Sequence, residues 1–69
     1  MTFHFNVGRS LRKVQADKRV TNKTLADTIG VNPVQVARWR SAEDLKLSRV
    51  VQLAHHFDMT IDDFLRVGQ

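Results

Sequence analysis

Apolar residues recur every three to four positions through most of the chain, which is the spacing of amphipathic α-helices. Five segments with this spacing are separated by short polar stretches. The pattern predicts an all-α fold, a compact five-helix bundle, with residues 1–69 forming one domain. We expect the helices over about 7–18, 21–29, 33–41 and 47–57, and a last one that opens at Thr60.

The segment 21–41 contains two of these helices, joined by a tight turn. Gly30 ends the first, where a residue without a Cβ can take the left-handed conformation. Asn32 is a good N-cap for the second helix, and Val36 and Trp39 give that helix its buried side. Two helices joined in this way form a helix-turn-helix, whose usual use is DNA recognition.

The two C-terminal helices have their own signals. The helix over 47–57 has a broad apolar face and Ser48 as its possible N-cap. We expect six side chains of this helix to pack inward: Leu47, Val50, Val51, Leu53, Ala54 and Phe57. Thr60 opens a capping box in outline, in which Asp62 and Asp63 lie near the positive helix end. We interpret this acidic pair as capping rather than acid–base chemistry, and we expect no enzyme.

The formal net charge is +4, and its distribution is uneven. Residues 1–42 contain eight Lys and Arg and two Asp, whereas 43–69 contain three basic and five acidic residues. A basic half that includes the helix-turn-helix favours a polyanionic partner. The absence of Cys excludes disulfides and thiolate metal sites, and His55 and His56 point about 100° apart on a helix. We therefore expect no metal and no cofactor.

No apolar run approaches the ~20 residues of a membrane span. The first residues lack the apolar core of a signal peptide, so we expect a cytoplasmic protein with no membrane partner. Residues 1–6 read as an N-terminal arm with two aromatic side chains, Phe3 and Phe5. The arm is interpreted as a flap over the core, with a dimer contact as the alternative.

With a helix-turn-helix formed by the second and third of five helices, the chain resembles the phage repressor and Cro family, whose fold is lambda-repressor-like. The resemblance runs without gaps over about 7–65. The matching motif positions are Leu25, Ala26, Ile29, Gly30, Val31, Val36 and Trp39. The downstream segment LAHHFDMTIDDFL is similar to the closing segment of the family.

The chain also departs from the family pattern. The first residue of the second helix is often Gln in the family and is Asn22 here. An Arg in the first helix often pairs with a Glu late in the third, but the corresponding residues here are Gln15 and Arg40. We therefore expect that buried ion pair to be absent. Ala42 stands where a Gly usually closes the third helix.

The resemblance implies that the helix over 33–41 lies in the major groove of double-stranded DNA. The residues then expected to contact bases are Asn32, Pro33, Val34, Gln35, Ala37, Arg38 and Ser41. The guanidinium of Arg38 matches guanine O6 and N7, and Val34 suits a thymine methyl group. The residues expected to contact phosphates are Asn22, Lys23, Arg40, Lys46, Ser48 and Arg49.

The leading hypothesis is a Cro-like repressor that binds a pseudo-palindromic operator as a homodimer. The dimer contact is expected to involve Ile61 and Phe64, with Phe3 and Phe5 as second choice. An antitoxin or a restriction–modification controller has the same fold and the same DNA partner. A protein-interaction module that has lost operator binding is the hypothesis from another class, and no small-molecule substrate is expected.

Overall fold

The computed structural model describes residues 5–69 and contains five α-helices and no strand within that range. The helices are α1 (Val7–Lys18), α2 (Asn22–Ile29), α3 (Pro33–Ser41), α4 (Leu47–His56) and α5 (Ile61–Val67). The expected all-α fold is confirmed, and each helix lies close to its expected place. Phe3 of the expected N-terminal arm lies outside the described residues.

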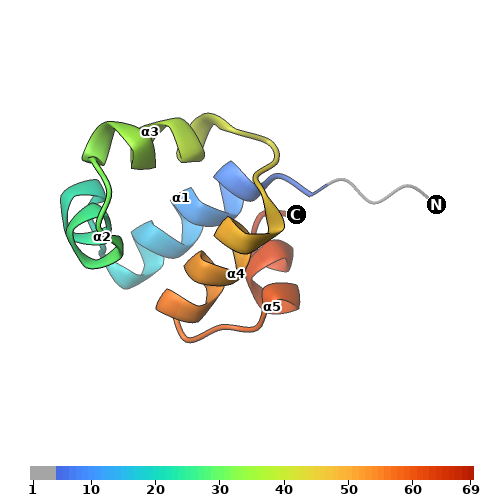
Figure 1. Cartoon of the computed structure of the whole chain (residues 1–69). Helices are drawn as coiled ribbons and strands as arrows, with labels where there is room; N and C mark the ends of the chain where they lie inside the picture. Colours follow the sequence, from blue (N-terminus) through green and yellow to red (C-terminus); the bar gives the residue numbers. More distant parts are fainter. Residues whose placement is uncertain (1–4) are drawn as a thin grey trace.

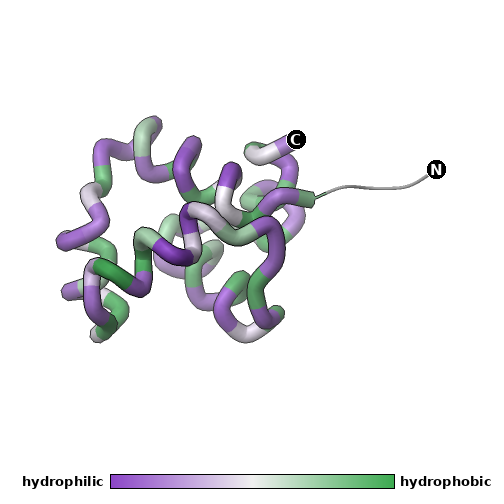
Figure 2. Tube along the Cα trace, turned by 90° about the horizontal axis from the view of Figure 1, so that it is seen from above, coloured by the Kyte–Doolittle hydropathy of each residue, from purple (hydrophilic) through white to green (hydrophobic). Residues whose placement is uncertain are grey.

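Helix α1 lies at the centre of the bundle and packs against both α3 and α5. Helix α2 packs against α3, and α4 packs against α5 (Figure 1). Every helix contributes at least one large side chain with no exposed surface: Leu11, Leu25, Val36, Leu53 and Phe64. Hydrophobic and hydrophilic residues alternate in short stretches along the trace (Figure 2), as expected for helices with one inward face.

The helix starts follow local capping chemistry. In four helices the side-chain oxygen of the N-cap accepts a hydrogen bond from a backbone N–H of the first turn. These N-caps are Asn6, Thr21, Asn32 and Thr60, with donor–acceptor distances of 2.8 to 3.1 Å. Gly30 has a φ of 87°, in the left-handed region, and closes α2 as expected.

The expectations for α4 were partly wrong. Leu47 is 69% exposed and Val51 is 43% exposed. Leu47 shares a face with the buried Ala54 but is the first residue of α4, and Val51 lies at the margin of the buried face. Ser48 is not the N-cap but the second helical residue. Lys46 occupies the cap position and makes no side-chain capping bond, so the first N–H groups of α4 are left without that partner.

The expected dimer contact at Phe64 is also wrong for this fold. Its side chain is fully buried in the core of one chain, so it has no surface to offer to a second copy. Ile61 is half-buried and packs against the same core, and Phe5 is 44% exposed. These two residues remain the candidates for a dimer contact among the described residues.

The start of α1 forms backbone hydrogen bonds with the loop that follows α3. The backbone N–H groups of Val7 and Gly8 donate to the carbonyl oxygens of Glu43 and Ala42, at 3.0 and 2.8 Å. A Cβ on Gly8 would lie 2.5 Å from the carbonyl oxygens of Arg40 and Ala42, closer than real atoms approach. The missing side chain of Gly8 therefore allows the end of α3 to lie directly against α1.

We predict that Gly8→Ala lowers the free energy of unfolding by about 1–3 kcal/mol, because the new methyl group overlaps backbone atoms. Helix propensity alone would raise the free energy of unfolding, since Ala in a helix is about 1 kcal/mol more favourable than Gly. Urea unfolding followed by circular dichroism measures the difference. The control Arg9→Ala, at an exposed site on the same turn, should stay within about 0.5 kcal/mol of the wild type. A stabilised Gly8→Ala chain would contradict the close contact.

Candidate nucleic-acid interface

The turn between α2 and α3 is held by three backbone and side-chain contacts. Gly30 and Val31 both donate their N–H groups to the carbonyl oxygen of Ala26, at 2.8 and 2.9 Å. Asn32 Oδ1 then accepts from the N–H of Val34 at 2.8 Å. Only two residues, Val31 and Asn32, separate Gly30 from the first residue of α3. A connection this short fixes the direction of α3.

Helix α3 lies along one edge of the bundle (Figure 1). It buries only Val36 and Trp39. Trp39 is 6% exposed, which agrees with its expected place in the core. The remaining sides of α3 follow from the helical period of about 100° per residue. Opposite the buried side lies an outer face, which we call the α3 outer face: Val34, Ala37, Arg38 and Ser41.

The structure leaves all seven residues expected to contact bases exposed. Four of them form the α3 outer face, Asn32 and Pro33 begin the helix, and Gln35 lies on the flank toward α4. Asn32, Val34, Gln35 and Arg38 line one open hollow on this side. The oxygen of Asn32 accepts the capping bond, and the NH2 group of that side chain can donate to a ligand.

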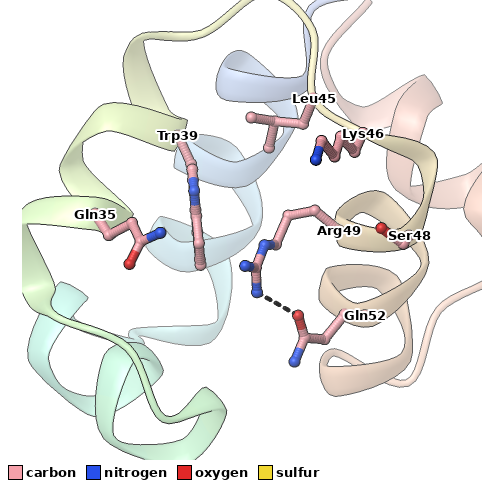
Figure 3. A pocket seen from close by; sticks show the side chains of 7 residues that line it. All are labelled: Gln35, Trp39, Leu45, Lys46, Ser48, Arg49 and Gln52. Atoms are coloured by element: carbon pink, nitrogen blue, oxygen red, sulfur yellow. Dashed lines mark hydrogen bonds between the residues drawn. The ribbon is translucent and has the colours of Figure 1, made fainter.

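A groove of about 510 Å³ separates α3 from α4 (Figure 3). Its lining residues come from both helices and from the loop between them: Gln35, Trp39, Leu45, Lys46, Ser48, Arg49 and Gln52. The guanidinium carbon of Arg49 lies 4.4 Å from the centre of the Trp39 ring, and Arg49 Nη1 donates to Gln52 Oε1. The indole face and the amide therefore hold the Arg49 charge in a fixed position within the groove.

The α3–α4 groove brings together three of the residues expected to contact phosphates. Lys46 and Ser48 are exposed at its rim, and Arg49 is half-buried. The sequence predicted these residues individually, but not the contact of Arg49 with Trp39. Nothing in the helical period indicated it, because Arg49 lies ten positions from Trp39 on a different helix.

The other flank of α3 is held by a buried amide that sequence reasoning did not identify as a functional residue. Gln15 of α1 is 3% exposed, and its Oε1 accepts from Arg40 Nη1 at 2.7 Å. Its Nε2 donates to the carbonyl oxygen of Val20 at 3.2 Å and to Asn22 Oδ1 at 3.0 Å. The ion pair implied by the resemblance is absent, as expected, and a hydrogen bond from Arg40 to a neutral amide replaces it.

Asn22, Lys23 and Arg40 form the second group of residues expected to contact phosphates. Lys23 is exposed, whereas Asn22 and Arg40 are half-buried and both bonded to Gln15. Ala42 follows α3 in an extended conformation with a φ of −86°, which does not require the glycine that is usual at this position in the family. The hydrogen bond from Arg40 to Gln15 of α1 therefore holds a cationic side chain at the end of α3.

Within residues 5–69, no group of three or more His, Asp or Glu side chains could hold a metal ion. In the same range, no helix has the length and apolar character that crossing a bilayer requires.

Comparison with known proteins identifies the family. A family model described as the Cro/C1-type HTH DNA-binding domain matches residues 10–68, which is most of the chain. The chain belongs to this family. The search of curated proteins and the search of solved structures each gave no significant match.

The contact between Arg49 and Trp39 gives a prediction that does not depend on a ligand. Arg49→Ala should increase the quenching of Trp39 fluorescence by acrylamide, because the guanidinium and its stem no longer cover the ring. The same substitution should lower the free energy of unfolding by about 1 kcal/mol. Trp39 is the only tryptophan, so its emission reports on this groove alone. Arg12→Ala, on the exposed side of α1, serves as the control and should change neither quantity.

Proposed function

We propose that this Cro/C1-type domain is a sequence-specific regulator of transcription that binds double-stranded DNA, and that it acts as a Cro-like repressor. The observation that carries the proposal is the α3 outer face. A helix that buries only Val36 and Trp39 leaves its opposite side, with Arg38, free to enter a major groove. The family match supports DNA as the partner. We expect the chain to act at the DNA of its host cell, by binding and not by catalysis.

The exposed positions of α3 support the base contacts expected from the sequence. Arg38 carries a forked donor suited to guanine, and Val34, 60% exposed, offers an apolar surface to a thymine methyl group. Pro33 has no N–H to donate and Ala37 has no polar atom, so few hydrogen bonds to bases are available. We infer that the shape of the DNA contributes to recognition.

Phosphate contacts are proposed on both flanks of α3. On one flank lie Asn22 and Lys23 at the start of α2, together with Arg40 at the end of α3. On the other lie Lys46, Ser48 and Arg49, where the first N–H groups of α4 have no side-chain cap. Two groups of donors around one recognition helix are the arrangement needed to hold that helix between two DNA strands.

We propose a homodimer on the operator, because one helix of this length reads too few bases for genomic specificity. Two copies related by a two-fold axis place their recognition helices about 34 Å apart, one turn of the double helix. Ile61 and Phe5 are the side chains we propose for the contact between copies, with Phe3 of the arm.

Binding to fragments of the genome that encodes the chain tests the proposed function. We expect gel shifts at low salt and a footprint with two half-sites whose centres lie about 34 Å apart. Sedimentation of the complex should give two chains per operator. A protein that binds no duplex even at low salt would instead support the interaction module, and a single half-site with one chain would refute the dimer.

Two substitutions should separate base reading from phosphate binding. Arg38→Ala should reduce discrimination at one operator position by about 1–3 kcal/mol, because a bidentate contact to a base is lost. Lys23→Ala should weaken operator and random DNA equally and reduce the slope of log K against log salt by about 1. Fluorescence anisotropy on both duplexes over a salt series measures these effects. Equal losses on both duplexes for Arg38→Ala would refute its base-reading role.

A further inference from the structure

The buried amide of Gln15 has only one possible orientation. Arg40 can only donate hydrogen bonds, so the group of Gln15 that lies 2.7 Å from its Nη1 must be the oxygen. The carbonyl oxygen of Val20 can only accept, so the group that faces it must be the NH2. Two independent partners therefore fix the same orientation, without any choice between the two ends of the amide.

The orientation of Gln15 fixes that of Asn22 in turn. Because the NH2 group of Gln15 faces Asn22, the inward atom of the Asn22 amide must be its oxygen, at 3.0 Å. The Asn22 NH2 group then faces away from Gln15. No buried side-chain nitrogen or oxygen within residues 5–69 lacks a partner, so this NH2 group, for which no protein partner is found, reaches the surface. It lies at the first residue of α2.

We propose that Gln15 is a positioning residue that makes Asn22 a dedicated hydrogen-bond donor to a DNA phosphate. Arg40 on the proposed recognition helix fixes the orientation of the Gln15 amide, and Gln15 in turn fixes the orientation of the Asn22 amide at the start of α2. Phosphate oxygens only accept hydrogen bonds, so an Asn22 amide turned the other way would present an oxygen to them and lose the contact. This inference rests on the proposed function, because DNA is the ligand.

Gln15→Glu replaces the NH2 group that faces Val20 and Asn22 with an acceptor oxygen, while the side chain keeps its shape. The carboxylate still accepts from Arg40, now as an ion pair, but it cannot donate to Val20 or to Asn22. The Asn22 amide then turns to donate inward, and its oxygen faces the DNA. We expect affinity for duplex DNA to fall by about tenfold, the scale of one hydrogen bond to a charged group, while the chain stays folded.

A double-mutant cycle with Asn22→Ala separates the inverted amide from the added negative charge. In the chain that carries Asn22→Ala, Gln15→Glu retains only its charge effect, so its cost should be at least about threefold smaller than in the chain that keeps Asn22. Equal costs in the two chains would overturn the proposal, since Gln15 would then not act through Asn22.

Gln15→Met is the matched variant without charge. It leaves Arg40 and the Val20 carbonyl without their buried partner, so it should destabilise the fold more than Gln15→Glu does. It leaves the Asn22 amide free to turn, so it should weaken DNA binding less than Gln15→Glu does. If Gln15 had only a structural role, the loss of binding would follow the loss of stability, and Gln15→Met would be the weaker binder.

Exchange of the side-chain amide protons with solvent, measured by NMR on the free protein, tests the polarity without DNA. In the wild type the Gln15 NH2 signals should be protected and those of Asn22 should exchange rapidly. In Gln15→Glu the Asn22 signals should become protected. Rapidly exchanging Asn22 signals in both chains would overturn the proposed polarity even if DNA binds. A wild-type chain that binds no duplex would refute the proposed function and the phosphate role, while the exchange data would still report the orientation.

Discussion

The position of α3 depends on its two ends, because a helix that buries only Val36 and Trp39 has little apolar area to hold it. At its start, the turn at Gly30 and the Asn32 cap fix its direction. At its end, the loop carbonyls accept from the first N–H groups of α1, and Gly8 allows the close approach. The proposed function requires α3 to keep an exposed outer face, and that leaves the helix only a small buried side. The contacts at its two ends compensate for this small apolar contact.

The two flanks of α3 hold their cations by different means. On one flank Arg49 lies over the Trp39 ring and bonds to Gln52, so an apolar face and a neutral amide fix the charge. On the other flank Arg40 is anchored by Gln15, again a neutral amide. Among residues 5–69, neither cation forms an ion pair with a carboxylate, so the positive charge of each remains available to a polyanion. Fixing them beforehand also reduces the side-chain entropy lost when a ligand binds.

The sequence predicted features whose causes lie within a few residues of one another. Thr21, Asn32 and Thr60 each cap a helix through an N–H two or three positions away, and Gly30 needs only its own backbone conformation. The sequence could not predict where along α4 the contact with the core begins. Leu47 shares the helical phase of the buried Ala54 but is the first residue of α4, where its side chain is exposed, so periodicity alone gave it the wrong environment.

The contacts that shape the candidate site join residues distant in the chain, and no local pattern encodes them. Gln15 and Arg40 are 25 positions apart, yet one sign was present in the sequence. Gln15 follows Leu11 by one helical turn and therefore shares its buried side, where a polar side chain must find partners. The partners were not predictable, because Asn22 and Arg40 lie on other helices, and the helical pattern of the sequence does not give the arrangement of the helices in space.

Replacing an ion pair with an amide changes the charge that DNA would meet. The pair implied by the resemblance, Arg on the first helix and Glu on the third, has no net charge. Here the cation is Arg40, on α3 itself, and its partner Gln15 is neutral, so one positive charge remains at the end of the proposed recognition helix. A neutral partner also avoids the cost of taking a carboxylate out of water. An amide can both accept from Arg40 and donate to Asn22, which a carboxylate cannot, so the neutral residue that leaves the Arg40 charge uncompensated also orients the neighbouring donor.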